Sequence, residues 1–181
     1  MLPNETIDAL IEAFPPLCTR VPCFPELLNK LENSLKASPP PHGRELSDKF
    51  LIDFDRRERD REYQPPPKLY YGYALNLEDC LLYFRDHQAN LPDISPNKHT
   101  GLLSAHISMI IEDHLTKLCD FTIRIGLVLD MKFDYIVRIY DSYGFQDYQL
   151  EDKDEKEVVD ILKQEFPKFN VQGNPRWFYA G

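Results

Sequence analysis

The sequence predicts an α+β fold: an antiparallel sheet of about four strands in the ferredoxin-like βαββαβ order, with one extra helix, preceded by N-terminal helices. Two observations predict it. Residues 120–130 alternate between an aliphatic or aromatic row and a mostly polar row, and a short turn separates them from a second strand-like segment, which indicates an antiparallel hairpin. The patterned segments after residue 68 follow the order strand, helix, helix, strand, strand, helix, strand.

The first 67 residues are predicted to be helical and divided by prolines. Apolar residues recur at helical spacing in three segments, 4–14, 25–36 and 44–63. Proline triplets follow the second and the third of these segments, where they stop a helix and stiffen the connector. We therefore expect residues 1–67 to form an N-terminal helical segment that packs on a sheet domain of residues 68–181, the two together making one compact unit.

The elements of the sheet domain are predicted from local composition. Residues 68–75 are rich in tyrosine and leucine, which favours a strand. Asn76 can cap a helix that runs to about residue 87, and a second helix follows over 100–118. The hairpin strands are predicted at 120–130 and 134–143. A helix over 153–166 ends at Pro167, and the aromatic segment 169–179 is predicted to be the last strand.

Charge and composition exclude several classes of function. The net charge of −9 repels phosphate backbones, and no run of lysine and arginine is free of acidic residues. We therefore expect no nucleic-acid partner and no anionic membrane surface. No segment approaches the ~20 apolar residues of a membrane helix, and the N-terminus lacks the basic start of a signal peptide. The sequence thus predicts a soluble, cytoplasmic protein whose four cysteines are free thiols.

Cofactor motifs are missing from the sequence. There is no glycine-rich phosphate loop, no nucleophile elbow, no Cys-x-x-Cys and no His-Glu-x-x-His, so we expect no cofactor. One metal alternative remains, because Cys18 and Cys23 have the same spacing as His114 and Cys119, and two such pairs could bind zinc. Thiols in a proline-rich turn explain the first pair better, because nothing in the flanking turns supports a zinc knuckle, and no metal site is predicted.

The polar face of strand 120–130 supplies the candidate ligand-binding residues. With a hairpin turn near Lys132, the register places Arg124 opposite Tyr140 and Gly126 opposite Arg138. Two guanidinium groups beside a tyrosine and a glycine could hold a carboxylate or a phosphate. Two alternatives stay open. The face could simply be solvated, or it could be covered by a second subunit or by the N-terminal helices.

Three further residues are candidates for binding or catalysis. Trp177 and Arg176 form the best predicted surface anchor for a partner, since exposed rings and guanidinium groups dominate many interfaces. His106 is a possible general acid or base, because imidazole titrates near neutral pH.

Together these features predict a non-catalytic protein that binds a protein partner or a small anionic ligand; one form of this prediction is a homodimer through the sheet face. The alternative is a small cofactor-free enzyme with a pocket between the sheet and the N-terminal helices. In that enzyme Arg124 and Arg138 orient an anionic substrate, and His106 and Tyr140 are catalytic. The sequence leaves open whether the chain is an enzyme.

Overall fold

The computed structural model describes residues 33, 37–41, 43–87, 100–130 and 132–181, and it confirms the mixed helix and sheet class. The strands are β1 (Leu69–Leu75), β2 (Arg124–Leu127), β3 (Tyr135–Asp141) and β4 (Arg176–Tyr179). The helices are α4 (Phe54–Arg59), α5 (Leu77–Asp86), α6 (Thr100–Cys119), α7 (Asp152–Glu165) and α8 (Lys168–Gln172), with a 3-10 turn η1 (Asp48–Phe50). Within these residues no helix has both the length and the apolar character that crossing a bilayer requires.

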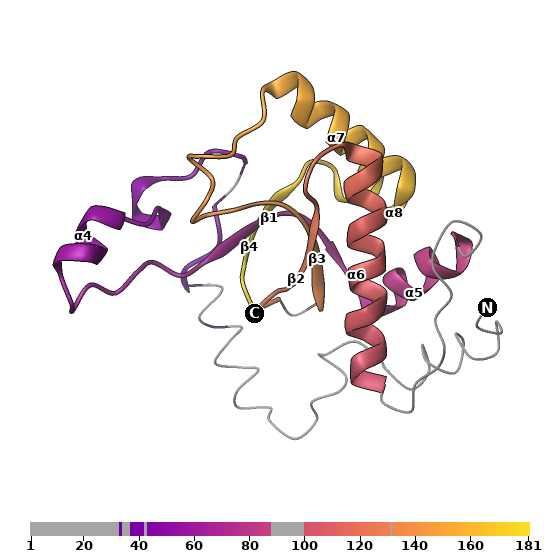
Figure 1. The fold of residues 1–181 in the computed structure, drawn as a ribbon, viewed down its shortest axis with the longest axis horizontal. Helices are drawn as coiled ribbons and strands as arrows, with labels where there is room; N and C mark the ends of the chain where they lie inside the picture. Colours follow the sequence, from indigo (N-terminus) through magenta and orange to yellow (C-terminus); the bar gives the residue numbers. More distant parts are fainter. Residues whose placement is uncertain (1–32, 34–36, 42, 88–99, 131) are drawn as a thin grey trace.

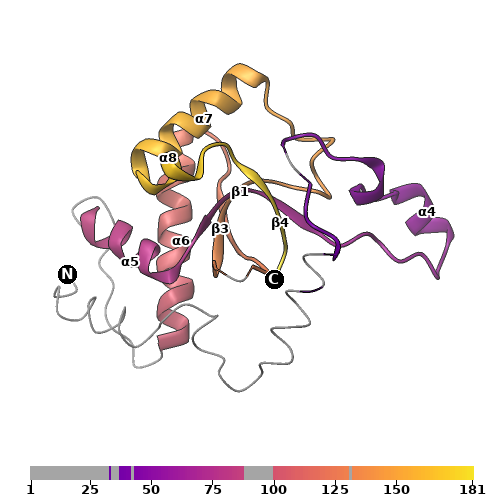
Figure 2. The same ribbon diagram turned by 180° about the vertical axis from the view of Figure 1, so that it is seen from behind.

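The four strands form one antiparallel sheet in the order β2-β3-β1-β4. Helices α5, α6, α7 and α8 lie on one side of this sheet, and α4 lies away from them, beyond the end of the sheet where β1 begins (Figures 1 and 2). The main core fills the space between the sheet and these four helices. Its largest fully buried side chains include Trp177, Tyr73, Phe169, Ile111 and Leu162.

The predicted helix over 44–63 is wrong, because the chain breaks it into η1 and α4. Leu51 and Asp53 adopt extended backbone angles, and the neighbouring side chains of Phe50 and Ile52 are buried. A new helix starts after Asp53, whose carboxylate accepts the Arg56 N–H at 2.8 Å. The helices predicted over 4–14 and 25–36 lie outside the described residues, apart from Asn33, and the division at residue 67 stays a prediction.

Strand β2 is shorter than the predicted strand over 120–130, and its aliphatic face is only partly covered. Ile123 is buried in the main core, but the side chains of Leu127 and Leu129 are 53% and 44% exposed. The reason is a change of partner. Beyond β2, Val128 pairs with Ala180 instead of continuing along β3, and it turns its own side chain into a second cluster.

This change of partner brings the two edge strands of the sheet together at one end. The Gly181 N–H donates to the Leu127 carbonyl at 2.9 Å, and the Leu129 N–H donates to the Tyr179 carbonyl at 2.9 Å. Both views show the end of the chain beside the end of β2 (Figures 1 and 2). The sheet is therefore curled. The face turned away from the helices is not an open polar surface, because it carries a second buried cluster of Ala74, Val128, Ile136 and Phe178.

A β-bulge interrupts the pairing of β1 with β3. Tyr71 lies opposite Tyr140 and Gly72 lies opposite Arg138, so Ile139 is an extra residue in β3. Side chains alternate along a strand, and one extra residue reverses which face each later side chain meets. The strands approach so closely here that a Cβ atom on Gly72 would lie 1.9 Å from the Val137 carbonyl oxygen. The bulge therefore requires glycine at residue 72.

We predict that Gly72→Ala is strongly destabilising. The added methyl group collides with backbone, which cannot rotate away, so the two central strands must separate. We expect a loss of about 3 kcal/mol or more in the free energy of unfolding, measured by urea denaturation. Gly144→Ala is the control, because the atoms nearest to its Cβ would belong to side chains, Tyr148 at 3.3 Å and Asp141 at 3.8 Å, and not to backbone. A Gly72→Ala variant as stable as that control would contradict the tight bulge.

Candidate functional site

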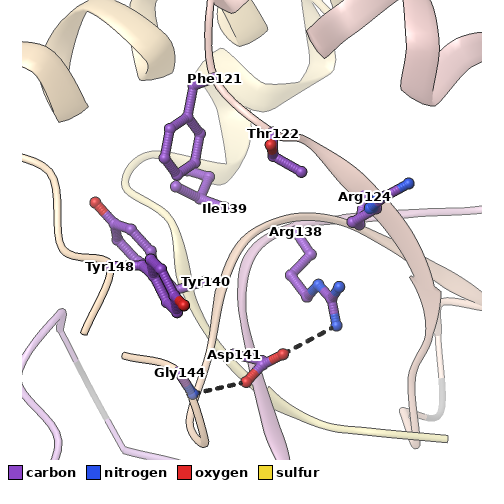
Figure 3. A pocket seen from close by; sticks show the side chains of 9 residues that line it. All are labelled: Phe121, Thr122, Arg124, Arg138, Ile139, Tyr140, Asp141, Gly144 and Tyr148. Atoms are coloured by element: carbon purple, nitrogen blue, oxygen red, sulfur yellow. Dashed lines mark hydrogen bonds and ion pairs between the residues drawn. The ribbon is translucent and has the colours of Figure 1, made fainter. Parts of the chain in front are cut away.

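A pocket of about 300 Å³ opens beside the bulge in β3. Figure 3 shows the residues that line it, which come from the segment before β2, from β2 itself, from β3 and from the turn after β3. They are Phe121, Thr122, Arg124, Arg138, Ile139, Tyr140, Asp141, Gly144 and Tyr148. The volume is at the small end of the range of ligand sites in proteins.

One wall of the pocket is apolar and largely aromatic. Tyr140 is buried, Phe121 packs edge-on against it with 6.2 Å between the ring centroids, and Ile139 is buried beside them. Tyr148 closes this wall from the solvent side, and it is 74% exposed. A flat or branched apolar group can therefore enter between the buried ring of Tyr140 and the exposed ring of Tyr148.

Arg138 forms the centre of the polar wall. Its guanidinium group lies over the Tyr70 ring at 4.7 Å from the centroid, and its Nη1 donates to Asp141 Oδ2 at 3.3 Å. Figure 3 draws this contact as a dashed line. The stacking fixes the plane of the guanidinium group while its remaining N–H groups stay available for an anion.

Asp141 holds this wall together. Its Oδ1 accepts the N–H groups of Tyr143 and Gly144, both at 3.0 Å, and its Oδ2 lies 3.1 Å from Lys68 Nζ. Burial alone would raise the pKa of Asp141. The hydrogen bonds from Lys68 and Gly144 and the charge of Arg138 outweigh burial and hold this pKa below its ordinary value. Asp141 is therefore a carboxylate at neutral pH.

Arg124 is the second cation of the pocket, and it lies opposite Arg138 in the register of β2 and β3. The predicted register, with Arg124 opposite Tyr140, was wrong by two residues, although both arginines do share one face. The Arg124 side chain is 55% exposed, and its Nη1 donates to Glu112 Oε2 at 3.2 Å. The other oxygen of Glu112 accepts the Ile125 N–H at 2.6 Å, so one carboxylate of α6 bridges the side chain and the backbone of β2.

Tyr140 does not share the face of the arginines, because the bulge turns it to the helix side of the sheet. Its hydroxyl donates to Glu155 Oε2 at 2.9 Å and accepts the Leu150 N–H at 3.1 Å. Burial raises the pKa of Tyr140 above its ordinary value. At neutral pH this residue is thus a neutral, doubly bonded phenol whose ring lines the pocket.

Trp177 and Arg176, which were predicted to form a surface anchor together, lie on opposite faces of β4. Trp177 is 0% exposed, and its Nε1–H donates to the Arg44 carbonyl at 3.1 Å, so it is a core residue and not a surface anchor. Its neighbour faces the opposite side of β4, as strand geometry requires. Arg176 is exposed there, lies over the Phe178 ring at 4.7 Å, and does not line the pocket.

The remaining candidates lie on α6. His106 is exposed and does not line the pocket. His114 Nδ1 is 2.7 Å from the Tyr83 hydroxyl, and burial lowers the pKa of this histidine. Cys119 is a buried free thiol, and Cys18 and Cys23 lie outside the described residues. In the part of the chain that the structure describes, no three His, Cys, Asp or Glu residues are placed to hold a metal ion.

The geometry suits the binding of an anion with an apolar body. Sequence reasoning located Arg124 and Arg138, but it did not identify Phe121, Gly144 or Tyr148 as parts of a pocket. The turn that carries the last two is near in sequence to β3, and this proximity was the only available signal.

Comparison of the chain with protein-family models, with curated proteins and with solved structures finds no match.

Asp141 gives this site a predicted pH dependence. Its folded-state pKa is below its ordinary value of 3.8, so its charged form stabilises the fold at and above that pH. This contribution is lost as the pH falls through the folded-state pKa. We expect Asp141→Asn to unfold at a lower urea concentration than the wild type at neutral pH. The difference between the two urea midpoints should shrink as the pH falls from about 5 to about 2. Asp147→Asn, at an exposed position in the same turn, is the control. A difference that is constant across this range would contradict the assignment.

Proposed function

We propose that this chain is a non-catalytic binding protein whose pocket beside β3 holds an anionic group attached to an apolar body. The observation that carries the proposal is the pairing of two walls in one pocket: Arg124 and Arg138 on one side, and Phe121, Tyr140 and Tyr148 on the other. Guanidinium groups suit carboxylates and phosphates, and the rings suit the rest of the ligand. The ligand is a small anionic molecule or an anionic group of a partner protein.

The pocket chemistry favours binding over catalysis. Its nine lining residues include no histidine, cysteine or lysine, and their one carboxylate, Asp141, is held by the Lys68 ion pair and by two backbone N–H groups. The Tyr140 hydroxyl is already bonded to Glu155, and its raised pKa keeps it protonated at neutral pH, so it is not available as a base. Self-association through the sheet face has little support, because Ala74 and Ile136 at its centre are fully buried.

Two broader statements belong to the same proposal. The fold is of the ferredoxin-like kind, which is supported by the element order. Two connections also support it, because each skips one strand of the sheet: β1 connects to β2 past β3, and β3 connects to β4 past β1. The chain works in the cytoplasm, which is supported by the free thiols of Cys80 and Cys119, since a reducing compartment keeps thiols unpaired.

Titration with 3-phenylpropanoate tests the binding function. We expect it to shift the ¹H–¹⁵N signals of Thr122, Arg138 and Gly144, with a dissociation constant on the order of millimolar for so small a ligand. The uncharged 3-phenylpropanamide has the same shape and should bind at least about tenfold more weakly, because it lacks the charge that the guanidinium groups meet.

Two variants provide the matched comparison. Arg124→Gln removes the exposed cation of the pocket and should weaken phenylpropanoate binding about tenfold. Arg176→Gln removes an exposed arginine from β4, outside the pocket, and should leave binding unchanged. Circular dichroism checks that both variants are folded. Equal affinity of the acid and the amide, or no shift at these signals up to tens of millimolar ligand, rules out the proposed function.

A further inference from the structure

The pocket lies where β3 lacks a neighbouring strand. On one side β3 pairs with β1 as far as Tyr70↔Asp141, but on the other side its pairing with β2 ends at Arg124↔Arg138. In the described part of the chain, residues 139–141 therefore have no strand partner on the pocket side. Three residues of a strand span about 10 Å. This gap is long enough for a short extended segment of another chain.

The chain before β2 is held away from this gap. The Thr116 hydroxyl of α6 accepts the Ile123 N–H at 3.1 Å and donates to the Ile123 carbonyl at 3.3 Å. Asp120 has a positive φ of 46°, which turns the backbone from α6 toward β2. Since its backbone groups are bonded to the helix, Ile123 cannot continue the ladder along β3.

The chain itself makes contacts along the two outer strands of the sheet. Glu112 accepts the Ile125 N–H on the outer side of β2, and Gly181 donates to the Leu127 carbonyl. Ser38 and Arg44 contact the side chains of β4, where their carbonyls accept from Tyr179 and Trp177. Unpaired strand edges invite pairing with other chains, and proteins usually block them in these ways. On the pocket side, no described residue is seen to bond to the backbone of residues 139–141, so this stretch of β3 is left unblocked.

The positive charge of the arginines and the two faces of β3 determine which peptide segment would fit the gap. Arg138 lies on the curled side of β3, and Tyr140 lies on the helix side, so the cations and the rings line opposite faces of the same strand. Neighbouring residues of an added strand also point to opposite faces. An acidic residue followed by an apolar residue would meet both walls at once. Glu112, on the outer side of β2, already shows that Arg124 pairs with a carboxylate, at 3.2 Å.

We propose, on the basis of the proposed function, that the partner is an acidic protein segment that adds to β3 as a short antiparallel strand at residues 139–141. Its carboxylate pairs with Arg124 and Arg138, and the next side chain packs between Phe121 and Tyr148. Backbone hydrogen bonds to β3 provide affinity, and the alternation of acidic and apolar residues provides specificity.

A fluorescein-labelled heptapeptide with the sequence Thr-Val-Glu-Leu-Glu-Val-Thr tests this strand addition. Fluorescence anisotropy should give a dissociation constant at least about tenfold lower than that of 3-phenylpropanoate, because the peptide adds ladder bonds to the same charge contact. The peptide with glutamine in place of both glutamates should bind at least about tenfold more weakly. Arg124→Gln should weaken peptide binding similarly, and Arg176→Gln should not.

Two N-methylated peptides make the test decisive. Each carries methyl groups on alternate backbone nitrogens, so that each blocks one edge of the peptide strand. Only one edge can face β3, and we expect one peptide to lose binding at least about tenfold while the other retains it. Loss with both peptides, or with neither, contradicts strand addition.

If phenylpropanoate binds and the heptapeptide binds no more tightly, strand addition is wrong and the proposed function stands. If neither ligand binds, both proposals are wrong.

Discussion

The extra residue at Ile139 is the constraint on which the candidate site depends. Without it, Tyr140 would follow Arg138 on the curled face, and Asp141 would point under the helices. With it, Tyr140 reaches Glu155 at 2.9 Å in the core, and Asp141 reaches Arg138 at 3.3 Å outside it. Both consequences are favourable, because a phenol ring gains burial and a carboxylate gains cationic partners. A single bulge thus sorts the two residues into opposite environments.

The buried carboxylate of Glu155 connects this bulge to the segment before the sheet. It accepts from the Tyr140 hydroxyl and lies 2.9 Å from Arg44 Nε, while the Arg44 carbonyl accepts from Trp177. Tyr71 stacks on Tyr140 with 5.8 Å between the centroids, and burial raises the pKa of Tyr71 to about 12. A buried charge is tolerated when hydrogen bonds and an opposite charge surround it, and here both are present. This network fixes the inner wall of the pocket.

The sequence predicted the layout of the sheet domain well, because layout follows from local patterns. Strand β1, the helix start at Asn76 and the antiparallel hairpin were all readable from propensity, capping and alternation. The bulge was not readable from the sequence. The segment Ile136-Val137-Arg138-Ile139-Tyr140 places apolar side chains on both faces of the strand, so its pattern fits a strand with an inserted residue as well as one without. The contacts of Glu112 with β2 and the burial of Trp177 were equally inaccessible, because they depend on residues distant in sequence. The arginine pair was found because both members lie on the hairpin, where register errors of two residues preserve the face.

The net charge of −9 bears on how an acidic segment could bind this chain. At distances beyond the Debye length of about 8 Å, salt screens the repulsion between the chain and an acidic partner, so approach is neither strongly hindered nor steered. Attraction arises only within the pocket, where Arg124 and Arg138 lie close to the ligand. In the empty site Glu112 and Asp141 already partner these arginines, at 3.2 and 3.3 Å. An incoming carboxylate therefore meets arginines that already have carboxylate partners, so its charge adds about a tenfold preference over a neutral group and not most of the affinity. Affinity must then come mainly from the backbone ladder and from the rings, while the arginines select acidic over neutral segments.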